Sequence, residues 1–125
     1  MINKHTCLLC LGSNFDRHLR MRTAREALKE FFPNIQFSEE METKAIGDKM
    51  LSPFSNQVAQ FETDFSLEEI RQLLKAIERQ NGRMPEDKNQ GIVKLDIDIL
   101  AYGKQVIKPD DLQRDYVQKG LQSLT

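Results

Sequence analysis

The sequence predicts one α+β domain in which two helices alternate with four main strands. Two observations carry this prediction. Apolar residues recur at helical spacing in residues 16–32 and 67–80, and they alternate with polar residues in the segments around those two. With 125 residues, the chain is long enough for one domain with a continuous core. We expect that domain to cover residues 1–125, because no repeat, low-complexity stretch or linker divides the chain.

The first half of the chain predicts a strand, a helix and a second strand. Residues 5–11 alternate as a strand does, and Gly12-Ser13-Asn14 follows them as a turn. A helix is expected over residues 16–32, because Pro33-Asn34 stops it. An interrupted strand is expected over residues 35–43. The inward stripe of the helix is expected to consist of Leu19, Ala24, Ala27, Leu28 and Phe31.

The second half, from residue 54 onward, predicts a strand, a helix and a last strand. Residues 54–65 alternate and are rich in strand-forming residues. Ser66-Leu67-Glu68-Glu69 is a capping box, so a helix should begin there and run to about residue 80. A polar loop over residues 83–91 leads into a strand over residues 91–100, the most strand-like stretch of the chain.

A short extension at residues 104–107 and a weak helix from Pro109 complete the expected elements. The order of the main elements is β-α-β-β-α-β, which is the ferredoxin-like arrangement. We therefore expect an antiparallel sheet with two helices packed on one face. This fold supports many activities, so the function has to be argued from the side chains.

The composition argues against nucleic-acid and membrane partners. The formal net charge is -1 and the pI is about 6.1, so no overall positive field would attract nucleic acid or an anionic membrane. The arginines within residues 17–25 spread over more than one face of the predicted helix. No apolar run approaches the roughly 18–20 residues that a membrane-spanning helix needs. We expect a cytoplasmic protein.

Cys7 and Cys10 form a C-x-x-C pattern, which in other contexts marks redox or metal sites. Here both residues lie in a predicted strand, where positions three apart point to opposite faces. Two thiols on opposite faces cannot easily close a disulfide or share one metal ion. We expect both cysteines to be reduced and packed.

The last predicted strand carries two acids, Asp96 and Asp98, between apolar residues. Residues i and i+2 of a strand project from one face about 6.6 Å apart, so the pair could hold Mg²⁺, which takes one or two carboxylates besides water and phosphates. Lys94 has the same parity and could meet a phosphate. The same pattern also fits the wet face of a half-buried strand, with the lysine offsetting the acids. The pair alone leaves both interpretations open.

Six short motifs follow one another in a characteristic order: Gly12-Ser13-Asn14, Thr43 with Gly47, Phe54-Ser55-Asn56, Ile77-Glu78, Gly82-Arg83 and Leu95-Asp96-Ile97-Asp98-Ile99. Their order and spacing resemble those of the 6-hydroxymethyl-7,8-dihydropterin pyrophosphokinases. These are folate-pathway enzymes that transfer pyrophosphate from ATP to a pterin. The expected fold agrees with that of this family.

The resemblance implies a transferase that binds ATP with two Mg²⁺ ions and a pterin as its second substrate. It implies that Asp96 and Asp98 are the metal ligands. The other roles that it implies are pterin binding for Asn56, Phe54, Thr43 and Ile46, nucleotide binding for Glu78, Arg83 and Ile99, and catalysis for Arg83. We expect Lys88 and Lys94 to assist Arg83 in catalysis in place of arginines that the family has and this chain lacks.

The chain departs from the family pattern in the loop before the last strand. Pro85, Gln90 and Val93 stand where the family has an arginine, a tryptophan and another arginine. Beyond Leu112 the family's P-H segment and pterin-stacking aromatic residue have no counterpart, so we expect a domain truncated at its C-terminal end.

Arginines aimed at a triphosphate neutralise charge that develops during transfer, and a lysine does not reproduce their bidentate geometry. Two hypotheses follow. The chain is either a short, active pyrophosphokinase, or a non-catalytic relative that keeps a nucleotide or metal site for a binding or regulatory role.

Overall fold

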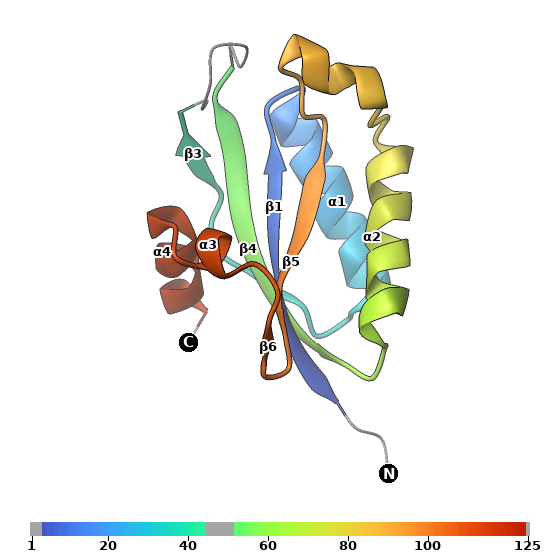
Figure 1. The fold of residues 1–125 in the computed structure, drawn as a ribbon, viewed down its shortest axis with the longest axis vertical. Helices are drawn as coiled ribbons and strands as arrows, with labels where there is room; N and C mark the ends of the chain where they lie inside the picture. The colour runs from blue at the N-terminus through green and yellow to red at the C-terminus, as the bar shows by residue number, and fades with distance from the viewer. Residues whose placement is uncertain (1–3, 45–51, 125) are drawn as a thin grey trace.

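The computed structural model describes residues 4–44 and 52–124, and these form an α+β fold built on one antiparallel sheet (Figure 1). Among the described residues the strand order is β2-β4-β1-β5-β6, and β3 also pairs with β4. The predicted fold class is thereby confirmed. The elements are, in chain order, β1 (His5–Ser13), α1 (Arg17–Phe31), β2 (Gln36–Phe37), β3 (Met41–Thr43), β4 (Phe54–Thr63), α2 (Leu67–Gln80), the 3₁₀ helix η1 (Pro85–Gln90), β5 (Asp96–Tyr102), β6 (Gln105–Val106), α3 (Pro109–Leu112) and α4 (Asp115–Ser123).

The strand expected over residues 35–43 is divided into β2 and β3, which both pair with β4. Ser38 lies between them, and its hydroxyl accepts the N–H of Val58 at 3.0 Å. The chain advances from Ser38 to Met41 while β4 moves only from Val58 to Asn56. One extra residue on the edge side is the signature of a β-bulge, and it explains the interruption in the sequence pattern.

The strand expected over residues 91–100 begins only at Asp96. Part of the polar loop before it is a helix, because Pro85–Gln90 forms η1. The backbone of residues 91–95 therefore does not follow the alternation of a strand, and side-chain directions extrapolated from β5 do not apply there.

The main core lies between the sheet and helices α1 and α2, which cover one face of it (Figure 1). The predicted stripe of α1 is wrong at two positions, because Leu19 is 49% exposed and Phe31 is 48% exposed. At 100° per residue, Leu19 lies opposite the buried Leu28 on the helix. Phe31 is the last helical residue, and the next residue, Phe32, turns inward and stacks on Phe61 at 3.9 Å between ring centroids.

Helices α3 and α4 lie on the other face of the sheet (Figure 1). No element was predicted from the sequence to pack on that face. Val117 of α4 packs with Val58 and Leu100 in a second, smaller cluster. The cysteines separate as expected, since Cys7 belongs to the main core and Cys10 packs against this second cluster. Both thiols are free, and burial raises the pKa of each to about 12.

Among the described residues, no helix combines the length and apolar character needed to span a membrane.

Gly120 allows α4 to approach the sheet closely. A Cβ at this position would lie 2.8 Å from Val58 Cγ2. We expect Gly120→Val to lower the free energy of unfolding by about 2 kcal/mol, as overpacked core positions do. Urea denaturation checks this. Val58→Ala in the same chain should recover part of the loss, and equal loss with and without that second change would contradict the proposed overlap.

Candidate active site

The register of the sheet brings two predicted site residues, Asn56 and Asp96, to either side of Gly12 near the end of β1. Gly12 pairs with Asn56 of β4 on one side and with Asp96 of β5 on the other. A Cβ on Gly12 would lie 3.2 Å from the Oδ1 atom of Asn56, which is tighter than ordinary van der Waals contact. A glycine in this strand therefore leaves room for the amide side chain.

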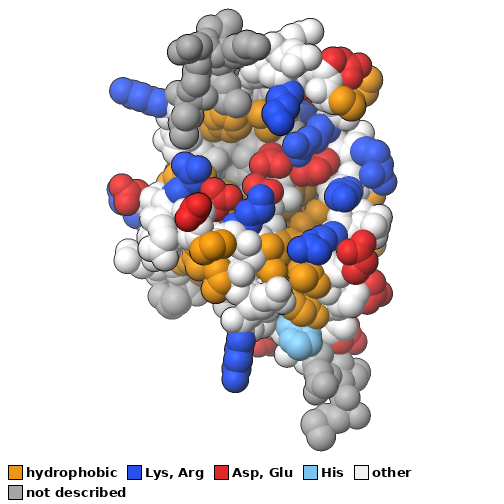
Figure 2. All heavy atoms as spheres, in the orientation of Figure 1, with side chains coloured by type: hydrophobic (Ala, Val, Ile, Leu, Met, Phe, Trp, Pro, Cys, Tyr) orange, Lys and Arg blue, Asp and Glu red, His pale blue; other side chains and the backbone are white. Residues whose placement is uncertain are grey.

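The side chains of Asp96 and Asp98 project from the face of the sheet that α1 and α2 do not cover. The intervening Ile97, and Ile99 after it, are buried in the main core. The side chains of Asp96 and Asp98 are 38% and 33% exposed, so both are partly shielded but reachable from solvent. Figure 2 shows acidic side chains gathered in a central hollow, with lysine and arginine side chains around them.

The proximity of the two carboxylates favours a cation between them. Burial, followed by the negative charge of Asp96, raises the pKa of Asp98 to about 7, while Lys108 acts in the opposite direction. Among the residues that the structure describes, no group of three or more His, Cys, Asp or Glu side chains could hold a metal ion. Two carboxylates nevertheless fit Mg²⁺, which completes its shell with water and phosphate oxygens.

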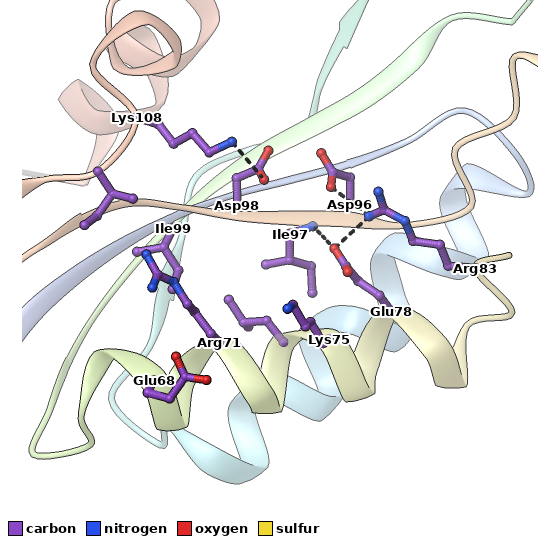
Figure 3. A pocket seen from close by; sticks show the side chains of 12 residues that line it. Glu68, Arg71, Lys75, Glu78, Arg83, Asp96, Ile97, Asp98, Ile99 and Lys108 are labelled. Carbon is purple, nitrogen blue, oxygen red and sulfur yellow. Dashed lines mark hydrogen bonds and ion pairs between the residues drawn. The ribbon is translucent and has the colours of Figure 1, made fainter. Parts of the chain in front are cut away.

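Arg83 and Glu78 form a network beside Asp96 (Figure 3). The Arg83 Nη1 donates to Asp96 Oδ1 at 2.8 Å and to Glu78 Oε2 at 2.9 Å. The same Glu78 oxygen accepts the backbone N–H of Ile97 at 2.8 Å. Burial raises the pKa of Glu78, and these two hydrogen bonds oppose that rise. Glu78 thus fixes both the guanidinium of Arg83 and the edge of β5.

The edge of β5 that faces α2 presents backbone polar groups. Ile97 donates its N–H to Glu78 at this edge, and β6 pairs only with Ala101 and Tyr102 further along the strand. In a strand, the N–H and C=O of alternate residues point to the same edge. The N–H and C=O of Ile99 therefore face this edge as well.

A cavity of about 540 Å³, here called the edge pocket, opens between α2 and this edge of β5. Glu78, Arg83 and Ile99, the residues expected to bind nucleotide, all line it. Leu74 and Ile107 contribute an apolar floor, and Figure 3 shows the charged side chains around it.

A second cavity of about 800 Å³, here called the face pocket, lies on the side of the sheet that carries α4. Thr43, Phe54 and Asn56, which were expected to bind the pterin, line it. Asn56 is 6% exposed, and its Nδ2 donates to the Thr43 hydroxyl at 2.6 Å. Asp96 and Asp98 line both the edge pocket and the face pocket, so the acid pair is where the two cavities meet.

Two predicted site residues remain, Lys88 and Ile46. Lys88 lines a smaller cavity of about 250 Å³ that also contains Arg83 and Asp96, so it stays close to the acid pair. Ile46, expected to bind the pterin, lies outside the described residues.

The structure does not bring Lys94 to the acid pair, although the sequence suggested a shared strand face. Lys94 precedes the start of β5, so the alternation does not include it. Its Nζ donates to the carbonyl of Gly82 at 2.9 Å and lies 3.4 Å from Asp87. Lys94 joins the end of α2 to η1 and lines neither pocket.

Sequence reasoning gave Asn14 no role, although it is part of the first motif. Its Nδ2 donates to the Gly91 carbonyl at 2.8 Å, and its Oδ1 accepts the Val93 N–H at 2.6 Å. The Asn14 N–H also donates to the Val93 carbonyl at 2.9 Å. The end of β1 thus holds the segment between η1 and β5. Its place in the first motif could have marked Asn14 as important. Its hydrogen-bond partners could not be predicted, because they lie almost 80 residues away in the sequence.

Sequence reasoning also missed cations that line the edge pocket. Arg71 and Lys75 lie one turn apart on α2 and point into the cavity (Figure 3). Lys108 approaches Asp98 from the segment before α3. Tyr116 of α4 was missed in the face pocket. Only the folded chain brings these residues into the two pockets that Asp96 and Asp98 line.

Comparison with known proteins finds relatives with similar sequences. The 2-amino-4-hydroxy-6-hydroxymethyldihydropteridine pyrophosphokinase of Aquifex aeolicus (strain VF5) is 36% identical over 104 residues, which are 82% of this chain and 64% of that protein. The protein of the same name from Haemophilus influenzae is 28% identical over 110 residues, which are 86% of this chain and 68% of that protein. The chain thus spans about two thirds of the length of each relative.

The profile of the 7,8-dihydro-6-hydroxymethylpterin-pyrophosphokinase (HPPK) family matches residues 8–125. The match continues past Leu112, beyond which the family's P-H segment and stacking aromatic residue had no counterpart in the sequence. The profile match covers nearly the whole chain, and the relative from Aquifex aeolicus is 36% identical over 82% of it. This chain belongs to the HPPK family.

Proposed function

We propose that this chain transfers pyrophosphate from ATP to 6-hydroxymethyl-7,8-dihydropterin, a step of folate biosynthesis. The observation that carries the proposal is the position of Asp96 and Asp98, which line both the edge pocket and the face pocket. A reaction between two substrates needs their reacting groups to meet at one point. Family membership supports the identity of the two substrates.

In this reaction the hydroxymethyl oxygen of the pterin attacks the β-phosphorus of ATP. The bond between that phosphorus and the α,β-bridging oxygen breaks, AMP leaves, and the hydroxyl proton passes to solvent. Two Mg²⁺ ions held by Asp96 and Asp98 would neutralise charge on the phosphate oxygens. Arg83 would add positive charge beside them, and Glu78 holds its guanidinium in place.

The edge pocket suits adenine as the base. The Ile99 N–H can donate to the N1 atom of adenine, and the Ile99 C=O can accept from its 6-amino group. Guanine presents the reverse pattern at these positions, a donor at N1 and an acceptor at O6, so the strand edge favours ATP over GTP. The apolar floor formed by Leu74 and Ile107 suits a planar ring.

The face pocket suits a pterin. Because one N–H of Asn56 Nδ2 donates to Thr43, the amide oxygen and the second N–H of Asn56 are left for a ligand. A pterin presents N–H donors at N3 and at its 2-amino group, which complement that oxygen. Phe54 and Tyr116 supply aromatic surface in the same cavity.

The proposal places the protein in the cytoplasm, where ATP is abundant and where its two free cysteines stay reduced.

A second candidate function, a non-catalytic binding or regulatory relative, is favoured by the positions of two cations. Lys94 is held by Gly82 and Asp87, away from both pockets. Arg83 is engaged by Glu78 and Asp96. In this alternative the protein would bind nucleotide or metal, in a binding or regulatory role, without transferring pyrophosphate.

AMP formation separates the two functions. The purified protein is incubated with ATP, Mg²⁺ and 6-hydroxymethyl-7,8-dihydropterin, and AMP is quantified by chromatography. We expect AMP only when the pterin is present, and none from the Asp96→Ala variant. Binding of the Mg²⁺–nucleotide complex in calorimetry without AMP formation, under conditions in which an active relative produces AMP, would support the non-catalytic alternative.

A further inference from the structure

Each carboxylate of the acid pair has its own cation, and the two cations come from opposite ends of β5 (Figure 3). Arg83 holds Asp96 with a hydrogen bond of 2.8 Å. Lys108 lies beside Asp98, with 3.9 Å between Nζ and Oδ1. The first contact is a charge-assisted hydrogen bond, whereas the second is beyond hydrogen-bond distance and is only coulombic.

The backbone of Lys108 is fixed while its ammonium group is held weakly. Its N–H donates to the carbonyl of Leu100 at 3.2 Å, and its C=O accepts from Leu112 at 3.0 Å in the first turn of α3. Pro109 follows it and restricts the chain. The side chain is 49% exposed. This arrangement tethers a cation at the mouth of the edge pocket without committing its three donors.

The charges that line the edge pocket are balanced before any ligand binds. Its cations are Arg71, Lys75, Arg83 and Lys108, and its acids are Glu68, Glu78, Asp96 and Asp98. A divalent cation beside Asp98 would repel the Lys108 ammonium group, since like charges at close range destabilise each other. The ammonium group of Lys108 would then have no anionic partner, and a phosphate oxygen of a bound polyphosphate could take that place.

We propose that Lys108 is a phosphate-binding residue of the edge pocket, and that it serves as the counter-ion of Asp98 until metal and nucleotide arrive. On their arrival its ammonium group passes from the carboxylate to a phosphate oxygen, so it remains paired throughout. Lys108 thereby supplies a cation that Lys94, held by Gly82 and Asp87, does not. This inference rests on the proposed nucleotide-dependent function.

The transfer of the Lys108 ammonium group predicts that removing its charge weakens nucleotide binding without weakening binding of the divalent ion. Lys108→Met keeps the length of the side chain and removes its charge. Affinity for the Mg²⁺ complex of an ATP analogue with a methylene group between the α- and β-phosphorus should fall about tenfold, the loss of one partly exposed charge-assisted contact. Affinity for the divalent ion alone should stay the same or rise, because a competing cation is gone.

The experiment measures both affinities on the full chain, the analogue by calorimetry and the ion as Mn²⁺ by electron paramagnetic resonance. Lys104→Met is the matched control, since Lys104 is an exposed lysine on the nearby turn after β5 and lines neither pocket. It should change neither affinity. Lys108→Arg should keep most of the analogue affinity. Thermal unfolding of each variant confirms that the fold is retained.

Unchanged analogue affinity in Lys108→Met would overturn the role of Lys108 while leaving the proposed function intact. Parallel loss of both affinities would also overturn it, because it would indicate a general disturbance of the site. If the parent chain binds no Mg²⁺–analogue complex, the proposed function fails and this inference fails with it.

Discussion

Replacing Asp98 with asparagine is expected to abolish Mg²⁺-dependent nucleotide binding and, at the same time, to stabilise the metal-free protein. The substitution keeps the shape of the side chain but removes a charged metal ligand. We expect nucleotide affinity in the presence of Mg²⁺ to fall by about a hundredfold or more, since Mg²⁺ has at most two protein carboxylates here. Calorimetry with the methylene analogue measures this loss.

The stabilising effect follows from the raised pKa of Asp98, which is about 7 in the folded protein. An exposed aspartate has a pKa near 3.9. Between these values the folded chain binds a proton that the unfolded chain does not, so the destabilisation due to Asp98 grows as pH rises from about 4 to 7. The gain in Asp98→Asn should be complete above pH 7 and disappear below about pH 4.

Thermal unfolding without metal, at several pH values, checks this part of the prediction. We expect the Tm of Asp98→Asn to exceed that of the parent by a few degrees at pH 8. Asp110→Asn is a matched control, because Asp110 is an exposed carboxylate in the neighbouring α3 and has no close cation in the described residues. A lower Tm for Asp98→Asn at pH 8 would show that the acid pair is not under repulsion in the ligand-free protein.

Replacing Asn56 with alanine is expected to remove pterin binding while leaving nucleotide binding unchanged. The Asn56 amide lines the face pocket but not the edge pocket. A site that hydrogen-bonds its substrate loses much of its affinity when one hydrogen-bonding group is removed. We therefore expect pterin affinity to fall about a hundredfold. Quenching of pterin fluorescence measures the first affinity, and calorimetry with the methylene analogue measures the second.

Thr43 provides the matched variants for this prediction. Thr43→Val removes the hydroxyl that accepts from Asn56 Nδ2, so the amide loses its fixed orientation and pterin affinity should fall by a smaller factor. Thr43→Ser keeps the hydroxyl and should retain most of the affinity. Equal loss of nucleotide and pterin affinity in Asn56→Ala would mean that the residue supports the sheet rather than the pterin.

Features encoded by neighbouring residues could be predicted from the sequence. The capping box at the start of α2 forms as expected, with the Glu69 N–H donating to the Ser66 hydroxyl at 3.1 Å and the Ser66 N–H to the Glu69 carboxylate at 2.9 Å. The shared face of Asp96 and Asp98 was also predictable, because a strand alternates with a period of two. These are local properties of the backbone.

Prediction from the sequence failed where a regular element began later than expected, or where the contacting residue was distant in sequence. Lys94 has the parity of the two acids, but β5 begins after it, so its side chain turns to Gly82. Lys108 belongs to none of the six sequence motifs, and only the fold of the segment before α3 brings it to Asp98.

The sequence by itself determined the α+β class, the two helices of the main core and the pair of acids on one face, because periodicity, caps and turns act over a few residues. Only the tertiary structure decided that Gly12 separates Asn56 from Asp96, that α4 covers the second face, and which lysine accompanies the acids. Those features depend on strand register and on contacts between distant segments. Such contacts arise when the whole chain buries its apolar surface, and no local pattern records them.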